Sequence, residues 1–296
     1  MPCSKGTLLT YGGGENRLKK LYGVIGDPVA HSMSPHMHND LFEFYSIDAT
    51  YVAFHVSPEN LQDAIKGFRA INLAGLSVTV PHKTAVMPLL DEIDPLAEAI
   101  GAVNTIVNDQ GRFIGYNTDG SGYLEGLKKE VSSFSDLNML LLGAGGAAKG
   151  IYFTMAQAGL KNIDIANRTI SKAEELVENC PFPVQSEVLS LQEAEEQLSK
   201  YDLIVQTTSI GLHPDVDASP ISVEKLKPTA IVSDIIYSPL ETKLLQEAKR
   251  KGARIQNGVP MFAYQGALQF EMWTGISPDI ERMKSACLKH LGGNIC

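Results

Sequence analysis

The stretch MLLLGAGGAA, residues 139–148, joins a continuous apolar run to a cluster of glycines. Such a run predicts a strand that is covered on both faces of a parallel sheet. Gly143, Gly145 and Ala148 match the pattern G-x-G-x-x-A, which permits a tight turn, close approach of a pyrophosphate and close helix packing. A helix N-terminus that follows the turn offers free N–H groups to that anion. The stretch therefore predicts a dinucleotide site, and a plain glycine-rich turn is the alternative.

The next predicted strand, residues 163–167, indicates which dinucleotide is bound. Sites for NAD place an acidic residue about 20 residues beyond the glycines, where it binds the ribose 2′-hydroxyl. This chain instead has Asn167, Arg168 and Thr169, with Lys172 one turn later. Arginine and lysine attract a 2′-phosphate, and arginine can bind it through two hydrogen bonds. We therefore predict NADP(H), and a solvated basic pair at a helix start is the alternative.

Short apolar runs alternate with longer helix-like segments along the whole chain, which is the pattern of βα units and a parallel sheet. Ser34 and Pro35 open a helix, with Ser34 as the expected N-cap and Pro35 in the first turn. Residues 102–108 and 112–118 flank a turn and predict a hairpin, so the first sheet should be mixed at one edge. Further strands are expected at residues 20–26, 50–56, 76–80, 139–145, 202–208, 230–236 and 253–258.

The length of 296 residues suggests two domains at roughly 150 residues each. We expect an α/β protein in which an N-terminal α/β substrate domain with a mainly parallel sheet precedes a Rossmann-type NADP-binding domain. The substrate-binding and catalytic domain should comprise residues 18–120 plus 259–296, and the Rossmann-type domain residues 121–258. Residues 1–17 are expected to form a loose leader.

Composition excludes several classes of protein. The 25 Lys and Arg residues against 34 Asp and Glu residues give a net charge of −9, which disfavours a nucleic-acid face. The longest apolar run, residues 139–148, is too short to span a bilayer, which needs about 20 residues, so no membrane association is expected. The scattered cysteines show no CxxC pair and no disulfide framework, so a cytoplasmic location is expected. His36 and His38 diverge on a helix, so no metal site is expected.

Polar side chains follow the predicted strands of the first domain, where α/β proteins bind ligands. Ser32 and Ser34 offer hydroxyls for a carboxylate, although Ser34 could act only as a helix cap. Thr79, Asn104, Lys83 and Asp119 add a hydroxyl, an amide, a cation and a carboxylate. This set suits a small polyhydroxy acid, and Lys83 beside Asp119 would form a proton-transfer pair.

Eight segments together resemble the shikimate dehydrogenase family over nearly the whole chain, from about Leu21 onward. They are GDPVAHSMSPHMHN, GLSVTVPHK, GAVNT, GYNTDG, GAGGAA, NRT, DIIYSPLET and MFAYQGA, in that family's order. The resemblance implies an NADP-dependent enzyme of aromatic amino-acid biosynthesis. Such an enzyme reversibly reduces 3-dehydroshikimate to shikimate with NADPH. The family often has Asn where Ser77 and Gln206 stand, which affects loop hydrogen bonding.

The resemblance also implies residue roles. Lys83 and Asp119 resemble the catalytic pair. The implied substrate-binding residues are Ser32, Ser34, Thr79, Lys83, Asn104, Asp119, Tyr237 and Gln265. The implied cofactor-binding residues are Gly143, Ala144, Gly145, Gly146, Ala147, Asn167, Arg168, Thr169, Lys172, Thr207, Ser209, Ile235, Gly258 and Met261.

Two alternatives stay open at this point. One is a quinate/shikimate dehydrogenase with relaxed use of NAD and NADP. The other, of a different class, is a non-catalytic shikimate-sensing protein that keeps the fold, which the intact Lys83 and Asp119 pair disfavours. The expected oligomeric state is a monomer or a homodimer.

Overall fold

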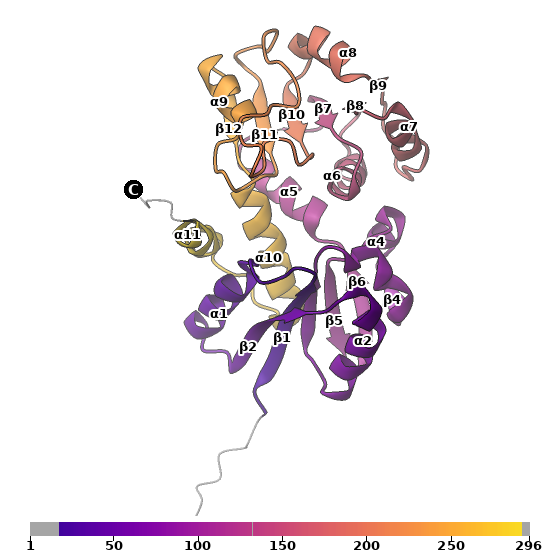
Figure 1. The fold of residues 1–296 in the computed structure, drawn as a ribbon, viewed down its shortest axis with the longest axis vertical. Coiled ribbons are helices and arrows are strands. Elements are labelled where there is room, and N and C mark those ends of the chain that lie inside the picture. The colour runs from indigo at the N-terminus through magenta and orange to yellow at the C-terminus, as the bar shows by residue number, and fades with distance from the viewer. Residues whose placement is uncertain (1–17, 132, 292–296) are drawn as a thin grey trace, which may run out of the picture.

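The structure is a computed structural model that describes residues 18–131 and 133–291. Its strands form two six-stranded sheets, one from the first part of the chain and one from the middle part. Figure 1 shows the two lobes one above the other, with helices α5 (Asp119–Leu127) and α10 (Val259–Thr274) between them. The leader expected at residues 1–17 lies outside the described residues.

The first sheet has the strand order β2-β1-β3-β5-β6-β4. Strands β1, β2 and β3 run parallel, whereas β5 lies antiparallel to both β3 and β6. The predicted hairpin and the mixed edge are therefore confirmed, and Gln110 and Gly111 form its turn with positive φ angles of 51° and 93°. The strand bounds are β1 Lys20–Gly26, β2 Ala49–His55, β3 Gly75–Val78, β4 Glu92–Ile93, β5 Thr105–Asp109 and β6 Arg112–Tyr116.

Helices cover both faces of this sheet, and alternating residues of β1 show it. Val24 packs into the cluster that contains Met37 of α1 and Phe270 of α10, whereas Ile25 packs into the cluster with Ile65 of α2. Burial on both faces explains why the strands are almost continuously apolar. The helices of this part are α1 Ser34–Phe44, α2 Leu61–Ala70, α3 His82–Ala85, α4 Pro95–Ile100 and α11 Ile280–His290, with 3-10 turns at Pro58–Asn60 and Met87–Leu89.

Two local expectations in this part are wrong. Ser34 is the first residue of α1 and not its N-cap, and the capping position Met33 makes no side-chain cap bond. The Ser34 N–H donates to the hydroxyl oxygen of Ser32 at 3.3 Å. Ser32 therefore supplies the acceptor for a backbone N–H at the start of the helix. Asn104 does not lie within a strand, because the chain leaves α4 through residues 101–104 and β5 starts at Thr105.

The second sheet is entirely parallel, with the order β12-β11-β10-β7-β8-β9. This is the doubly wound order of a Rossmann-type domain, whose direction reverses between β7 and β10. Its elements are β7 Asn138–Leu142, α6 Gly146–Gln157, β8 Asn162–Ala166, α7 Ile170–Glu178, β9 Val188–Leu189, α8 Leu191–Glu196, a 3-10 turn Leu198–Lys200, β10 Leu203–Gln206, β11 Ile231–Asp234, α9 Lys243–Arg250 and β12 Arg254–Gln256.

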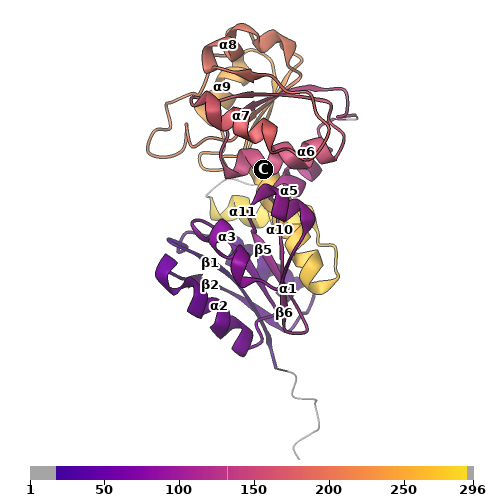
Figure 2. The same ribbon diagram turned by 90° about the vertical axis from the view of Figure 1, so that its right-hand side faces the viewer.

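Helices α5 (Asp119–Leu127) and α10 (Val259–Thr274) lie side by side between the two sheets (Figures 1 and 2). A Cβ atom added at Gly122 of α5 would lie 2.5 Å from the backbone nitrogen of Gln265 in α10. Only glycine therefore permits this approach of the two helices. The contact brings the first turn of α5, with Asp119, and the middle of α10, with Gln265, to the first sheet.

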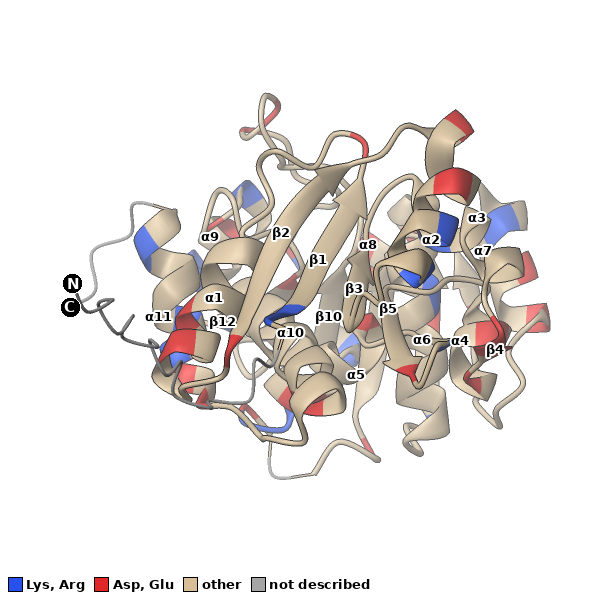
Figure 3. Ribbon diagram, turned by 90° about the horizontal axis from the view of Figure 1, so that it is seen from below, with Lys and Arg blue, Asp and Glu red and all other residues tan. Residues whose placement is uncertain are grey.

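In the ribbon of Figure 3, positions of Lys and Arg are interleaved with positions of Asp and Glu along the chain. That no nucleic acid binds the chain stays a prediction. Among the helices that the structure describes, none combines the length and apolar character needed to cross a membrane.

Candidate active site

An ion pair joins the first helix turn after β3 to the start of α5. The Nζ atom of Lys83 lies 2.6 Å from the Oδ2 atom of Asp119, and the two side chains are 31% and 18% exposed. Asp119 is the first residue of α5, where a helix N-terminus favours negative charge. Its backbone N–H donates to the side chain of Asn117, 3.1 Å away. The pair is therefore held from two elements and stays partly open to solvent.

Asn104 donates a hydrogen bond to the second carboxylate oxygen of Asp119. Its Nδ2 atom donates to Asp119 Oδ1 at 2.8 Å and to the hydroxyl of Thr118 at 3.1 Å. Its Oδ1 atom accepts from the Thr118 N–H at 2.8 Å and from the Thr105 hydroxyl at 2.7 Å. Because donors lie at one end of this buried amide and acceptors at the other, its orientation is determined. Both oxygens of Asp119 thus accept hydrogen bonds, one from Asn104 and one from Lys83.

The other hydroxyl candidates, Ser32, Ser34 and Thr79, follow the carboxyl ends of β1 and β3. Ser32 and Ser34 precede and begin α1, and Ser34 is 7% exposed. Thr79 follows β3, and its N–H donates to the carbonyl of Ile25 at the end of β1. The carboxyl ends of β1 and β3 therefore bring the two serines, Thr79 and Lys83 together. His82 is buried and bonds the carbonyl of Val56 at 2.6 Å, in accord with a packing role.

Two candidates come from the later part of the chain. Tyr237 lies beyond β11, and its ring centroid is 5.4 Å from that of Phe262 in α10. Burial raises the pKa of the Tyr237 hydroxyl, so this residue is a neutral donor at neutral pH. Gln265 is 9% exposed, and its Nε2 atom donates to the carbonyl of Phe262 at 3.0 Å.

The glycine turn lies where the second sheet reverses direction. Gly143 follows β7 with a φ angle of 113°, and an added Cβ would lie 2.7 Å from the Thr207 hydroxyl oxygen. That hydroxyl donates to the carbonyl of Leu142, which ties the ends of β7 and β10 together. Gly145 caps α6 and is exposed, as is Gly146, with no atom within 4 Å of an added Cβ. The turn thus leaves open space in front of free helix N–H groups, which fits a pyrophosphate.

Basic residues follow the neighbouring strand. Asn167 begins the turn after β8, and its Nδ2 atom donates to the carbonyl of Thr169, the N-cap of α7. Arg168 and Lys172 are both exposed at the start of that helix. No acidic residue stands between Asn167 and Lys172, so nothing in this turn repels a 2′-phosphate.

The other cofactor candidates lie around these two turns. Ala144, Ile235 and Met261 pack as partly buried side chains against one core cluster. Gly258 approaches Ile235 so closely that an added Cβ would lie 2.1 Å from its carbonyl oxygen. Ala147 is partly buried in the first turn of α6, and Ser209 is exposed beyond β10.

Sequence reasoning gave no site role to two buried glutamines. Gln206 ends β10 and makes three hydrogen bonds, to Thr208 through both amide ends and to the carbonyl of Ile210. It shapes the turn that carries Thr207 and Ser209. Gln269 lies in α10, and its spacing of four residues after Gln265 is the signal that could have found it. Across residues 18–131 and 133–291, no three His, Cys, Asp or Glu side chains are grouped to hold a metal ion.

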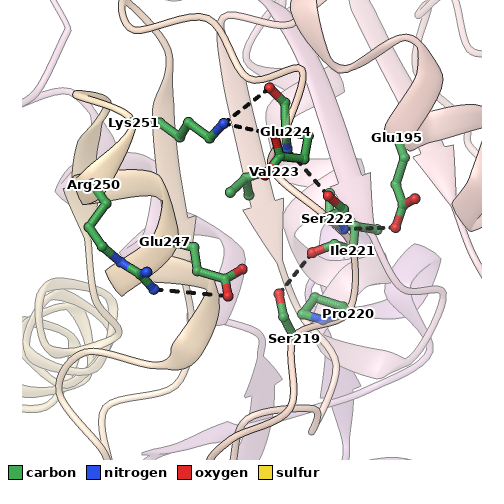
Figure 4. Close-up of a pocket in the computed structure, with 10 residues that line it drawn as sticks. All are labelled: Glu195, Ser219, Pro220, Ile221, Ser222, Val223, Glu224, Glu247, Arg250 and Lys251. Atoms are coloured by element: carbon green, nitrogen blue, oxygen red, sulfur yellow. Dashed lines mark hydrogen bonds and ion pairs between the residues drawn. The ribbon is translucent and has the colours of Figure 1, made fainter.

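A separate hollow of about 500 Å³ lies at α8, α9 and the segment 219–224 (Figure 4). Its charged side chains are engaged with one another or with backbone. Lys251 pairs with Glu224 at 3.0 Å, Arg250 approaches Glu247 at 4.0 Å, and Glu195 accepts from the Ser222 N–H at 2.7 Å. The hollow contains none of the residues predicted for the site.

A doubly wound parallel sheet with a glycine turn at its reversal point, beside a second sheet that bears a Lys–Asp pair, defines a dinucleotide-dependent dehydrogenase. Three family models match the chain. They describe the shikimate dehydrogenase substrate binding domain at residues 24–106, shikimate / quinate 5-dehydrogenase at residues 125–232, and the shikimate 5'-dehydrogenase C-terminal domain at residues 258–288. The chain belongs to the shikimate dehydrogenase family.

Individual relatives agree with this assignment. A protein named shikimate dehydrogenase (NADP(+)) from Geobacillus sp. (strain WCH70) is 56% identical over 277 residues, which cover 93% of this chain and 100% of the relative. Shikimate 5-dehydrogenase from Thermus thermophilus, in complex with NADP(H) and shikimate, has 38% identity and a TM-score of 0.83, covering 92% and 99% of the two chains. The Listeria monocytogenes enzyme with shikimate and NAD has 36% identity and a TM-score of 0.87, covering 90% and 96%. The predicted family and fold class are confirmed.

Proposed function

We propose that this chain is an NADP-dependent shikimate dehydrogenase that reversibly reduces 3-dehydroshikimate to shikimate, a step of aromatic amino-acid biosynthesis. The observation that carries the proposal is the Lys83–Asp119 pair, held by Asn104, at the edge of the substrate sheet. The names of the relatives support the same reaction and the same cofactor.

The substrate is an anionic ring with hydroxyl groups, and the site offers a partner for each. Ser32 and Ser34 supply hydroxyls beside the N-terminus of α1, which favours a carboxylate. Thr79, Asn104, Gln265 and Tyr237 supply hydroxyl and amide groups for the ring hydroxyls. Lys83 retains two N–H donors after its bond to Asp119, because an ammonium group carries three.

Lys83 manages the proton of the reaction. In the reducing direction, negative charge develops on the carbonyl oxygen of the substrate. The Lys83 ammonium donates a proton to that oxygen or stabilises its charge, and Asp119 orients the ammonium. Asn104 keeps Asp119 in place, since its amide occupies the other carboxylate oxygen. In the reverse direction the neutral amine takes the proton back.

NADPH supplies the hydride when it is bound. The pyrophosphate fits the open turn at Gly143, Ala144, Gly145, Gly146 and Ala147, where helix N–H groups are free. Asn167, Arg168, Thr169 and Lys172 hold the adenosine 2′-phosphate. Thr207, Ser209, Ile235, Gly258 and Met261 line the ribose and nicotinamide end.

One assay decides among this proposal and its two alternatives. The full-length chain is incubated with shikimate or quinate, each with NADP+ or NAD+, and the absorbance of the reduced nicotinamide is followed. We expect turnover with shikimate and NADP+ and much weaker turnover in the other three combinations. Comparable rates with quinate and NAD+ would favour a quinate/shikimate dehydrogenase. Binding of shikimate without turnover would favour a sensing protein and overturn the proposal.

Three further proposals accompany this function. The substrate part comprises residues 18–120 plus 259–296, and the NADP-binding part residues 121–258. The enzyme acts in the cytoplasm, as the scattered cysteines without a disulfide framework indicate. It works as a monomer or a homodimer, which sedimentation of the purified chain would distinguish.

A further inference from the structure

A buried run of hydrogen bonds leads from Tyr51 through Ser77 to Gln269, to which the proposed reaction assigns no role. Gln269 is 2% exposed and lies one helical turn after Gln265 in α10. A buried amide is costly unless both of its ends are paired. The partners of its two ends therefore show what Gln269 holds in place.

The oxygen end of Gln269 faces β3. Its Oε1 atom accepts from the Ser77 hydroxyl at 2.7 Å, and Ser77 in turn accepts from the Tyr51 hydroxyl at 2.7 Å. Because the single proton of Ser77 goes to Gln269, the run of bonds has one direction. That direction sets the oxygen of the Gln269 amide toward the sheet and its nitrogen toward the site.

The nitrogen end of Gln269 faces the candidate substrate residues. Its Nε2 atom donates to Gln265 Oε1 at 2.9 Å and lies 3.4 Å from the Thr118 hydroxyl and 3.5 Å from the Asn104 carbonyl. Gln265 Oε1 is occupied by this donor, and one N–H of Gln265 Nε2 donates to the carbonyl of Phe262 at 3.0 Å. The second N–H of that nitrogen is the donor left for a ligand. An unconstrained glutamine would present either end.

We infer that Gln269 is a positioning residue for substrate binding, which makes Gln265 present its remaining N–H donor to the ring hydroxyls and braces Thr118 beside Asn104. This inference rests on the proposed function, in which Gln265 is a substrate ligand. Gln269 acts through its neighbours, so its loss should weaken shikimate binding and leave the proton chemistry of Lys83 intact.

The test is Gln269→Met, which keeps the length of the side chain and removes its donor and acceptor. We expect the Kd for shikimate, measured by calorimetry, and the KM for shikimate to rise about tenfold, as for one lost hydrogen bond. The kcat and the KM for NADP+ should stay within about threefold of wild type, given an intact Lys83 pair and cofactor turn. A merely structural role would instead change the constants of both ligands together.

Gln256→Met is the matched control. Gln256 is also buried, at 7% exposure, and it bonds Ser233 and the carbonyl of Gly126 in the other half of the molecule. We expect its Kd for shikimate to match that of wild type. A tenfold weakening in this control as well would mean that any buried amide loss disturbs binding, and it would overturn the inference.

Ser77→Ala provides a second variant, in case Gln269→Met does not fold. It removes only the hydroxyl that orients Gln269, so we expect the Kd for shikimate to rise about threefold. In a Gln269→Met background the same change should have no further effect, because Ser77 acts through Gln269. An unchanged Kd for shikimate in either single variant would overturn the inference. So would a double variant whose Kd rises by the product of the two single effects. Absence of turnover in wild type would overturn the proposed function alone, because the binding comparison still stands.

Discussion

The Nζ atom of Lys83 lies 2.6 Å from the Oδ2 atom of Asp119, although 36 residues separate them in the chain. Lys83 belongs to α3 and Asp119 opens α5, so two loops at one sheet edge bring them together. The second Asp119 oxygen accepts from Asn104 at 2.8 Å. With both oxygens engaged, the carboxylate is suited to orienting Lys83, and Lys83 is the group left to face the substrate.

Replacing Lys83 with Ala should therefore affect the chemical step. We expect kcat for shikimate oxidation to fall by about 10²–10⁴-fold, the range of general acid–base contributions, with a much smaller change in KM. Steady-state absorbance assays measure both constants. The control is Lys66→Ala, since Lys66 is an exposed lysine of α2 whose Nζ atom lies 3.2 Å from Asp63 Oδ1. A near-normal kcat for Lys83→Ala would refute the assigned role.

Arg168→Ala tests the choice of cofactor. Arg168 is exposed in the turn after β8, where it is available to a 2′-phosphate. Loss of charged hydrogen bonds should raise the KM for NADPH about tenfold to a hundredfold. The KM for NADH should stay within about twofold of its wild-type value. Arg112→Ala, at an exposed arginine paired with Glu92 in the other sheet, is the control. An unchanged ratio of the two KM values would remove Arg168 from the site.

Gly143→Ala tests the turn after β7. The φ angle of 113° disfavours any side chain, and a Cβ would lie 2.7 Å from the Thr207 hydroxyl oxygen. We expect the free energy of unfolding, measured with urea, to fall by about 1–3 kcal/mol, together with weaker NADPH binding. The comparison is Gly67→Ala in α2, where no atom lies within 4 Å of an added Cβ and φ is not positive. That change should raise the free energy of unfolding by up to about 1 kcal/mol. Equal stability of the two variants would contradict this account.

Asp234 makes stability depend on pH. Burial raises its pKa from 3.8 to about 6, although the Ile236 N–H and the Thr242 hydroxyl both donate to the carboxylate. Between these values the folded protein binds more protons than the unfolded chain. The stabilisation from this group is therefore fully present below a pH of about 4 and is lost as the pH rises through about 6, a change of up to about 3 kcal/mol.

Asp234→Asn should remove that dependence, because an amide does not titrate. Urea unfolding near pH 4 and pH 8 measures it, and the change across this range should be less unfavourable in the variant by up to about 3 kcal/mol. Asp63→Asn, at a carboxylate that is 84% exposed, is the control. An identical pH dependence in Asp234→Asn and wild type would show that Asp234 titrates alike in both states.

The sequence by itself determined the elements that depend on local pattern. Apolar runs predicted the strands, and the turn residues around Gln110 and Gly111 predicted the hairpin. The glycines after β7 and the basic residues after β8 indicated the kind of cofactor, because close backbone approach and phosphate charge demand those residue types. The order of motifs indicated the family.

Only the tertiary structure decided which side chains meet. Asn104, Asp119 and Lys83 come from three segments, and their hydrogen bonds exist because β3, β5 and α5 converge at one edge. Gln269 looks like any polar residue of α10 until packing against β3 brings it within 2.7 Å of Ser77. Ser34 matched a helix cap in sequence, yet the hydroxyl of Ser32 lies where the Ser34 N–H needs an acceptor. Local patterns specify elements, whereas the pairing of buried polar groups depends on the approach of segments far apart in the chain.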